Sequence, residues 1–402
     1  MGIRTKFNPM GALPKGGEKI IRQVACSRYT TAVIMDNGDL YMCGRNDYGQ
    51  QGNGNTTNVL KFTKRASNVK QVACSDYTTW YIDENGDLYG CGYNSDGQQG
   101  NGNTTNVLTF TKRASNVKQV ACSYNTTWYI DNNGDLYGCG SNSDGQQGCE
   151  SRVLTFTKRA SNVKQVACSY ETTWYINTSN QLYGCGYNAY GQQGSGNTTN
   201  VSGFTSRLSS VSDVWVTPST TWAKTTNLQL YGCGKNGSGQ QSANNTTDIK
   251  SFTQRKTSFN GNVSCCEATT WYIDNNGDLY GCGSNYYYQL GNGNTTNVLT
   301  FTKRASNVKQ VACSEYSTLY LTQNGDLYAA GYNLDGGISG GYSNTIKDFT
   351  MVASNCKQFV KSEQTAFYIS NEGELFGTGA NSYGQQGNGN TYTVRTFSKI
   401  KI

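Results

Sequence analysis

The stretch KQVACSDYTTWYIDENGDLYGCGYNSDGQQGNGNTTNVLTFTKR, residues 70–113, contains the pattern that decides the fold. Four short runs rich in Val, Thr, Tyr and Trp predict four β-strands. These runs span 70–74, 78–82, 87–92 and 107–113. Asn85-Gly86 separates the second run from the third and predicts a two-residue type I′ hairpin, in which both residues need positive φ. The segment 93–106, rich in Gly, Asn and Gln, predicts a long polar loop before the fourth strand.

This unit recurs eight times along the chain of 402 residues. A Leu that opens the third strand and a Phe in the fourth strand each occur eight times, at intervals of 46–49 residues. A period of this length, with four strands and a hairpin inside the unit, predicts a β-propeller blade rather than a helical repeat or a solenoid. We therefore expect an all-β protein with an eight-bladed β-propeller of four-stranded blades at 20–402. Seven blades plus a displaced terminal unit is the alternative. The Leu markers are Leu40, Leu88, Leu136, Leu182, Leu230, Leu279, Leu327 and Leu375.

The composition limits the chemistry that the chain can support. Histidine is absent, which removes the commonest general base and the commonest zinc ligand. We therefore expect no enzyme, no bound metal and no cofactor. The 33 basic and 26 acidic residues leave a net charge of +7, which is too mild to indicate nucleic-acid binding. No apolar run is long enough to span a membrane, and residues 1–19 contain no signal-peptide core.

The segment VACSDYTTWYIDENGDLYGCGYNSDGQQG, residues 72–100, resembles the repeat of the regulator of chromosome condensation family. All eight units follow the order of that repeat over residues 20–402, and the resemblance implies a β-propeller. The founding members of the family have seven blades and promote nucleotide exchange on a small GTPase, using acidic residues, histidine and a projecting hairpin. Here the family's Gly is Ser75, its His is Thr78, and no long insertion interrupts the spacing. The resemblance therefore implies the fold, and without the histidine and the projecting hairpin it does not imply exchange activity.

Twelve of the 15 cysteines occupy two repeat positions, one in the first strand and one in the third. Disulfides between these positions would leave unpaired thiols in the units with Val216 and Ala330. We therefore expect reduced thiols that pack as small buried residues. The first-strand set is Cys26, Cys74, Cys122, Cys168, Cys265 and Cys313, and the third-strand set is Cys43, Cys91, Cys139, Cys185, Cys233 and Cys282.

Five tryptophans share one position in the second strand, where the other units have Ala32, Leu319 and Phe367. Exchange for apolar residues predicts packing between neighbouring blades rather than a ligand cage. The five are Trp80, Trp128, Trp174, Trp222 and Trp271.

The copies differ most just before the second strand and around a constant Asn in the long loop. Tyr, Ser, Asp and Asn dominate at these places, a composition typical of binding surfaces that combine rigid aromatic area with adaptable hydrogen bonding. Drift at unconstrained loops is the alternative explanation. The candidate binding residues are Arg28, Tyr29, Arg45, Tyr48, Tyr77, Tyr93, Asp96, Tyr124, Tyr170, Tyr187, Tyr190, Lys235, Tyr286, Tyr287, Tyr316, Tyr332 and Tyr383.

A basic pair in the fourth strand, Lys64-Arg65, recurs in several units and would form a ring of positive charge. Aligned cations suit contacts with phosphates. Nearby Asp and Glu residues dilute this charge, so nucleic acid is a minor alternative. The copies are Lys112-Arg113, Lys158-Arg159 and Lys303-Arg304.

Residues 1–19 precede the repeat and, with two prolines and four glycines, predict an extended arm. The stretch IRTKFNPMG within it resembles attachment segments of tailed-bacteriophage virion proteins. We expect a non-enzymatic propeller, anchored in a virion by the arm, whose loop face recognises a protein or glycan. The alternative is an intracellular, cytoplasmic regulator that binds a small GTPase or chromatin. The candidate attachment residues are Arg4, Lys6, Phe7 and Pro9.

Overall fold

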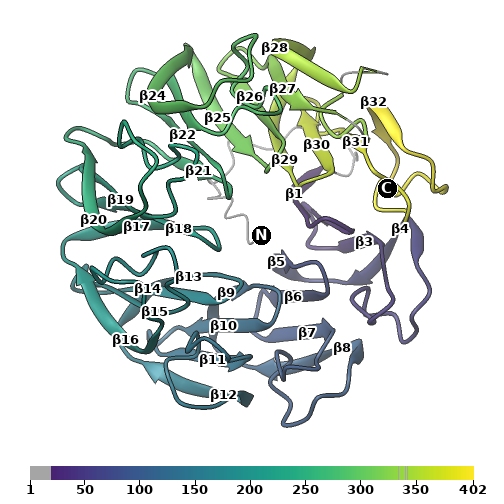
Figure 1. The fold of residues 1–402 in the computed structure, drawn as a ribbon. Coiled ribbons are helices and arrows are strands. Elements are labelled where there is room, and N and C mark those ends of the chain that lie inside the picture. Colours follow the sequence, from purple (N-terminus) through teal and green to yellow (C-terminus); the bar gives the residue numbers. More distant parts are fainter. Residues whose placement is uncertain (1–19, 334, 340, 342) are drawn as a thin grey trace.

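The computed structural model describes residues 20–402 except 334, 340 and 342. Over these residues the chain forms eight four-stranded antiparallel sheets, arranged as blades around a central axis, and no helix (Figure 1). Each blade takes its four strands from one continuous stretch of sequence, with the first strand innermost and the fourth outermost. The predicted eight-bladed propeller is confirmed, and the alternative of seven blades is wrong.

The first four blades share one order of strands, and in blade 2 each strand end lies within one residue of the predicted run. Blade 1 contains β1 (Ile21–Cys26), β2 (Thr30–Met35), β3 (Leu40–Gly44) and β4 (Val59–Ala66). Blade 2 contains β5 (Val69–Cys74), β6 (Thr78–Asp83), β7 (Leu88–Gly92) and β8 (Val107–Ala114). Blade 3 contains β9 (Val117–Cys122), β10 (Thr126–Asp131), β11 (Leu136–Gly140) and β12 (Val153–Ala160). Blade 4 contains β13 (Val163–Ser169), β14 (Thr172–Asn177), β15 (Leu182–Gly186) and β16 (Val201–Leu208).

The other four blades repeat this order. Blade 5 contains β17 (Val211–Val216), β18 (Thr220–Thr225), β19 (Leu230–Gly234) and β20 (Ile249–Lys256). Blade 6 contains β21 (Val263–Cys265), β22 (Thr269–Ile273), β23 (Leu279–Gly283) and β24 (Val298–Ala305). Blade 7 contains β25 (Val308–Cys313), β26 (Ser317–Thr322), β27 (Leu327–Tyr332) and β28 (Thr345–Ala353). Blade 8 contains β29 (Cys356–Lys361), β30 (Thr365–Ser370), β31 (Leu375–Gly379) and β32 (Val394–Ile400).

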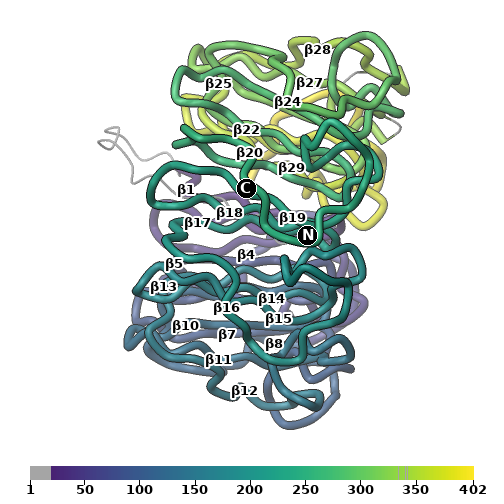
Figure 2. Tube along the Cα trace, turned by 60° about the vertical axis from the view of Figure 1, so that its left-hand side comes forward, coloured from purple at the N-terminus to yellow at the C-terminus, as the bar shows by residue number. Residues whose placement is uncertain are grey.

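Blade 8 closes the ring against blade 1 without exchanging a strand. The Thr31 hydroxyl and the Cys43 thiol of blade 1 donate hydrogen bonds to the main-chain carbonyl of Gln385 in blade 8, at 2.7 and 3.5 Å. Val33 of blade 1 packs with Phe367 of blade 8 in one buried cluster. Figures 1 and 2 both show the purple first blade beside the yellow last blade. Closure therefore depends on the same side-chain packing that joins every other pair of neighbours.

The hydrophobic core of the described chain is divided into eight clusters, each shared by two neighbouring blades. In the cluster between blades 2 and 3, Trp80 is fully buried and meets the ring of Phe156 edge-on at 5.8 Å. Gly90 lies opposite Trp80 in the next strand, and a Cβ there would come within 2.3 Å of the indole. The prediction that the tryptophans pack between blades is confirmed.

All fifteen cysteines are free, and those of the third strand also join neighbouring blades. The Cys91 thiol donates to the Gln50 carbonyl of the preceding blade at 3.5 Å, and the Cys233 thiol donates to the Gln192 carbonyl at 3.4 Å. In blade 8 the hydroxyl of Thr378 makes the equivalent bond to Gly336 at 2.8 Å. Burial raises the pKa of the Cys91 thiol well above its ordinary value, so it stays protonated as a donor. The predicted packing as small buried residues is confirmed for the six cysteines of the third strand, whereas Cys26, Cys74 and Cys265 of the first strand are half-buried. The donor role of the third-strand thiols was missed.

The hairpin between the second and third strands differs from the predicted two-residue turn. In blade 2, Gly86 has φ of 82° whereas Asn85 has no positive φ, and the Gly86 amide donates to the Asp83 carbonyl at 3.0 Å. The Asp83 carboxylate accepts from the amides of Asn85 and Asp87, at 3.0 and 2.8 Å. The prediction of a type I′ turn is wrong because the aspartate closes a three-residue loop in which only the last residue is left-handed.

Leu228 of blade 5 occupies this left-handed position with φ of 60°, although it is not glycine. A left-handed conformation costs a residue with a Cβ roughly 1–2 kcal/mol. Leu228→Gly should therefore raise the free energy of unfolding by about 1 kcal/mol, since the side chain is 37% exposed and contributes little to the core. Denaturant titration of both proteins measures the change. The mirror substitution Gly277→Leu in blade 6 should lower stability by a similar amount, and a loss in both variants would contradict this explanation.

Candidate functional site

Each blade presents two loops at one end, because the strands are antiparallel. The inner loop joins the first strand to the second, and the outer loop joins the third to the fourth. In the inner loop of blade 2, the Ser75 hydroxyl accepts from the Thr78 amide at 3.1 Å and bonds the Thr78 hydroxyl at 2.9 Å. These two residues stand where the regulator of chromosome condensation repeat has Gly and His. Here they form a rigid turn between buried strands.

The constant Asn organises the outer loop. In blade 1, the fully buried Asn46 donates through Nδ2 to the Asn53 side-chain oxygen and to the Asn55 and Thr57 carbonyls, at 2.9 to 3.0 Å. Its Oδ1 accepts from the Gln51 amide at 2.9 Å. The bonds of this one side chain therefore reach across the loop from Asn46 to Thr57. The same network forms around Asn94, Asn188, Asn236, Asn285 and Asn381.

A glutamine in the outer loop of one blade positions the inner loop of the next. Gln192 accepts from the Tyr190 amide at 2.9 Å and donates to the Pro218 carbonyl of blade 5 at 2.9 Å. Gln240 and Gln289 make the same bridge to the carbonyls of Glu267 and Glu315. From blade 4 to blade 7 the variable residues therefore sit on a fixed frame that extends from one blade to the next.

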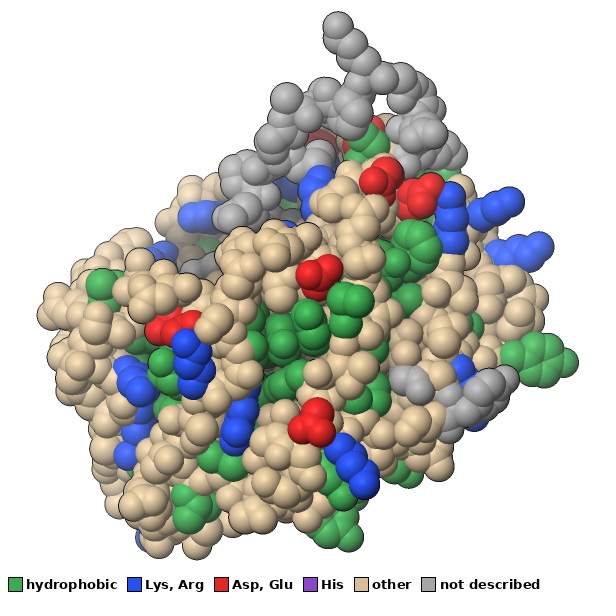
Figure 3. Space-filling model, turned by 90° about the horizontal axis from the view of Figure 1, so that it is seen from above, with side chains coloured by type: hydrophobic (Ala, Val, Ile, Leu, Met, Phe, Trp, Pro, Cys, Tyr) green, Lys and Arg blue, Asp and Glu red, His purple; other side chains and the backbone are tan. Residues whose placement is uncertain are grey.

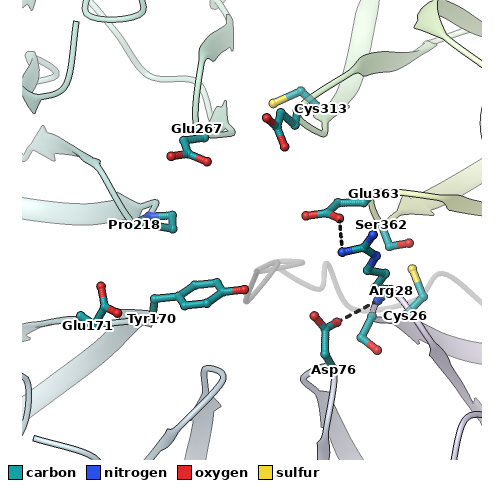
Figure 4. A pocket seen from close by; sticks show the side chains of 12 residues that line it. Cys26, Arg28, Asp76, Tyr170, Glu171, Pro218, Glu267, Cys313, Ser362 and Glu363 are labelled. Carbon is teal, nitrogen blue, oxygen red and sulfur yellow. Dashed lines mark hydrogen bonds and ion pairs between the residues drawn. The ribbon is translucent and has the colours of Figure 1, made fainter. Parts of the chain in front are cut away.

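The inner loops surround a central opening, where a cavity of about 260 Å³ is lined by residues of seven blades (Figure 4). Arg28 lies on one side of the opening. Its guanidinium forms an ion pair with Glu363 at 3.4 Å, and its main-chain amide donates to Asp76 at 3.1 Å. On the opposite side Tyr170 points into the opening, with Glu171 and Pro218 beside it.

The lining of the opening is acidic. Five carboxylates reach it, against the single guanidinium of Arg28 among its lining residues. Burial raises the pKa of Glu171, and the charge of Asp144 raises it further. The carboxylates are those of Asp76, Glu171, Glu267, Glu315 and Glu363. None of them was among the candidate binding residues, which were chosen mainly for aromatic side chains. The signal in the sequence is an acidic residue that recurs just before the second strand.

Next to this opening, Arg45 lies among four tyrosine rings. Its guanidinium carbon is 5.0 to 5.6 Å from the ring centroids, and its Nε pairs with Asp47 at 2.6 Å. These distances are those of cation–π contacts. The rings belong to Tyr29, Tyr48, Tyr77 and Tyr383, from blades 1, 2 and 8. We call this set with Arg45 the arginine cluster. It continues through Tyr93, Tyr124 and Tyr170 along blades 2 to 4.

A second group of rings, which we call the tyrosine cluster, lies on blades 6 and 7. Tyr287 meets Tyr316 at 5.0 Å and Tyr332 at 5.5 Å, and Tyr286 lies 5.0 Å from Tyr287. Burial, followed by the hydrogen bond and charge of Glu315, raises the pKa of Tyr316 to about 12. On blades 4 and 5, Tyr190 packs near Tyr187, and Lys235 lies 5.0 Å above its ring.

The structure therefore brings thirteen of the seventeen candidate residues into the two clusters or the opening. Tyr187, Tyr190 and Lys235 form a separate group, and Asp96 joins none of these. Burial raises the pKa of Asp96. Most of the tyrosines pack on one another, while Tyr170 and Tyr286 are the exposed ones, at 38% and 71%. The candidate attachment residues Arg4, Lys6, Phe7 and Pro9 lie outside the described residues.

The repeated lysines of the outer strands are paired with carboxylates. Lys112 bonds Asp87 at 2.6 Å, and Lys64 bonds Asp39 at 2.7 Å. Lys158 and Lys303 form the same pair with Asp135 and Asp278. Figure 3 views the ring edge-on and shows basic and acidic side chains scattered over this edge. Because each of these four lysines is paired with a carboxylate, they do not form a continuous basic stripe that could contact phosphates.

Among the described residues, no group of three or more Cys, Asp or Glu side chains is arranged to hold a metal ion. None of these residues belongs to a helix with the length and apolar character that a membrane crossing needs.

Eight blades, a loop-lined opening and rigidly held variable loops define the class of this protein, which is a β-propeller built from tandem repeats. The family model described as the RCC1-like domain matches residues 4–302, and the model described as the Regulator of chromosome condensation (RCC1) repeat matches residues 308–336. The chain therefore belongs to the RCC1-like propeller family, whose members are generally binding scaffolds. The predicted resemblance is confirmed.

Solved structures of the family show the same fold. Human WBSCR16 is 17% identical, with a TM-score of 0.62 over 90% of this chain and 95% of that chain. Prp20p from Saccharomyces cerevisiae is 17% identical, with a TM-score of 0.59 over 88% and 84%. Yeast RCC1 (Prp20) bound to Kap60 is 17% identical, with a TM-score of 0.58 over 88% and 81%. No curated protein sequence matches the chain.

Proposed function

We propose that this chain is a non-enzymatic scaffold that binds a partner protein through the loop face around its central opening. The observation that carries this proposal is the contrast between frame and surface. A buried Asn holds the outer loops of six blades in the same way, and Gln side chains link three of these loops to the next blade, while the residues at the opening differ from blade to blade. A fixed frame that presents variable aromatic and charged side chains on one face suits protein recognition.

The partner classes to test first are a small GTPase and histones. Binding to either would identify the chain as an intracellular regulator. This chain shares its fold with Prp20p, whose crystal structure is described together with its binding properties to Gsp1p and histones. The acidic opening supports a basic partner surface by charge complementarity. Exchange activity has less support, because the family's His position is Thr78 and its hydroxyl is committed to Ser75.

Titration of the full chain with purified Gsp1p and with purified core histones, followed by calorimetry, tests this proposal. We expect one of them to bind and Arg28→Glu to change the affinity, since Arg28 lies in the opening. Tyr392→Ala is the matched control, because Tyr392 is 79% exposed and outside both clusters. The hypothesis of an intracellular regulator would be overturned if neither protein bound. It would also be overturned if Arg28→Glu and Tyr392→Ala changed the affinity equally.

The second hypothesis is a virion component that presents the same face to a host protein or glycan. It rests on the resemblance of residues 3–11 to phage attachment segments, and no comparison with known proteins supports it. Localisation to a virion or to the cytoplasm stays a prediction. The genes that flank the coding sequence provide the test: neighbouring capsid and tail genes would favour the virion, and their absence would remove it.

A further inference from the structure

Two groups of three tyrosines on the loop face have nearly the same geometry. In blades 1 and 2, Tyr48 meets Tyr77 at 5.1 Å and 82°, and both rings contact Tyr93. In the tyrosine cluster of blades 6 and 7, Tyr287 meets Tyr316 at 5.0 Å and 86°, and both contact Tyr332. The repeat aligns the three residues of one group with the three of the other. The first group therefore serves as an internal template for the second.

The two groups differ in the residue before the constant Asn. In blade 1 this residue is Arg45, whose guanidinium carbon lies 5.6 Å from the Tyr48 ring and 5.4 Å from the Tyr77 ring. In blade 6 the same position holds Ser284, which accepts a bond from Gln289 at 3.3 Å. In blade 1 the guanidinium of Arg45 covers the tyrosines, whereas Ser284 supplies no cation at the same position in blade 6.

The neighbours of Ser284 are also smaller than those of Arg45. Tyr29 and Tyr383, which flank Arg45, correspond in the repeat to Ala268 and Ser238. Tyr287 and Tyr316 keep the two rings that face the cation. Short side chains therefore replace the cation and half of its aromatic surroundings.

The charge around the tyrosine cluster favours a cation. Glu315 precedes Tyr316 and lines the central opening, and Glu267 lines it beside the cluster. Glu267 has a cationic partner in Lys235, at 3.7 Å. Glu315 forms no ion pair with any of the described basic residues. Tyrosine faces next to a carboxylate that no described basic residue pairs with attract a guanidinium, and partly desolvated sites strengthen the contact.

We propose that the tyrosine cluster of blades 6 and 7 receives an arginine side chain from a basic segment of a partner protein, in the place that Arg45 has in blade 1. This inference rests on the proposed protein-binding function and names the chemistry that the partner must present. The arginine would lie against Tyr287 and Tyr316, with its charge toward Glu315. The exposed ring of Tyr286, in the position of Asp47, would cover the neighbouring part of the segment.

The test uses the full chain and two capped octapeptides, one of alternating Gly and Arg and one of alternating Gly and Lys. We expect the arginine peptide to bind and the lysine peptide to bind less tightly, because a guanidinium stacks on aromatic rings. Tyr316→Ala should weaken the arginine peptide by about tenfold. Ser284→Arg should weaken it at least as much, since the chain would then supply its own cation.

The matched control is Ser141→Arg, which makes the same change at the same repeat position in blade 3. There the residues that correspond to Tyr48 and Tyr77 are Asp144 and Glu171. This variant should bind the arginine peptide within about twofold of the parent chain. Equal loss in Ser141→Arg and Ser284→Arg, or no binding of the arginine peptide to the parent, would overturn this site. If a partner protein binds the chain but the arginine peptide does not, only the arginine site is overturned. If nothing binds at the loop face, the proposed function is overturned.

Discussion

Trp128→Ala should destabilise blade 3, and a second substitution, Gly138→Met, should restore most of the loss. Trp128 is fully buried and meets the ring of Phe204 in blade 4 at 5.8 Å. Removing a buried indole costs about 3–5 kcal/mol. Gly138 is paired with it across the two strands, and a Cβ at Gly138 would lie 2.4 Å from the indole. Gly138→Met alone should therefore prevent normal packing of the blade.

Blade 1 shows why the double variant should fold. It has Ala32 opposite Met42 in the same register, and both are fully buried. The surrounding cluster of blade 1 contains Val69, Val72 and Tyr81 from blade 2, and the cluster around Trp128 contains Val163, Val166 and Tyr175 from blade 4. The environment is therefore closely similar, and the exchange keeps most of the total side-chain volume at the position.

Chemical denaturation of the two single variants and the double variant measures the coupling. We expect a favourable interaction of at least about 2 kcal/mol between the substitutions, as for residues in direct contact. Trp128→Ala combined with Gly90→Met places the two changes in different blades and should show no compensation. If the losses from Trp128→Ala and Gly138→Met simply add, then blade 3 does not allow the exchange of side-chain size between its second and third strands that blade 1 shows.

The repeat made this core predictable, because the same exchange recurs along the chain. Leu319 lies opposite Ala329 in blade 7, so a smaller residue in the second strand accompanies a larger one in the third. The period, the eight blades and the buried cysteines followed from the same comparison of copies. The hairpin did not, because Asp83 closes the turn through its side chain and shifts the left-handed residue to Gly86 alone.

The site was predictable only in part. Variation between copies identified the correct loops, but neighbours in sequence have different roles there. Arg28 lines the opening, whereas Tyr29 packs into the arginine cluster. Which carboxylates share the opening depends on ring closure, which brings together inner loops that are one or more repeats apart. One unit read alone contains no information on that convergence.

Lys361 should lower the free energy of unfolding at neutral pH, because it is a buried amine that no described carboxylate pairs with. It occupies the first-strand position of blade 8, where other blades have Cys or Val216. Its side chain is 1% exposed, and Nζ donates to the Ser314 hydroxyl and the Ser362 carbonyl, both at 2.9 Å. No described carboxylate pairs with it. Burial lowers its pKa from 10.5 to about 8.

This lowered pKa makes the cost depend on pH in a defined direction. Below about pH 8 the amine is charged in both states, so the folded protein bears the full cost of burying the charge. Between about pH 8 and 10.5 the folded protein has released the proton while the unfolded chain still holds it. The unfolded state then binds more protons, so the contribution of Lys361 to stability rises by about 1.4 kcal/mol per pH unit.

Lys361→Met removes the titrating amine and keeps an unbranched side chain of similar length. We expect the variant to exceed the parent in free energy of unfolding by roughly 3 kcal/mol at pH 7, and this advantage to shrink steadily from pH 8 to pH 10. The tyrosines that also titrate at high pH are common to both proteins and cancel in the difference, whereas the Cys26 thiol, whose pKa the charge of Lys361 lowers, contributes to it. Denaturant titrations at pH 7, 8, 9 and 10 provide the measurement. Lys70→Met, at an exposed lysine of β5, should show no such trend. A difference between Lys361→Met and the parent that stays constant over this range would show that the buried amine remains charged, held by the two oxygens of Ser314 and Ser362.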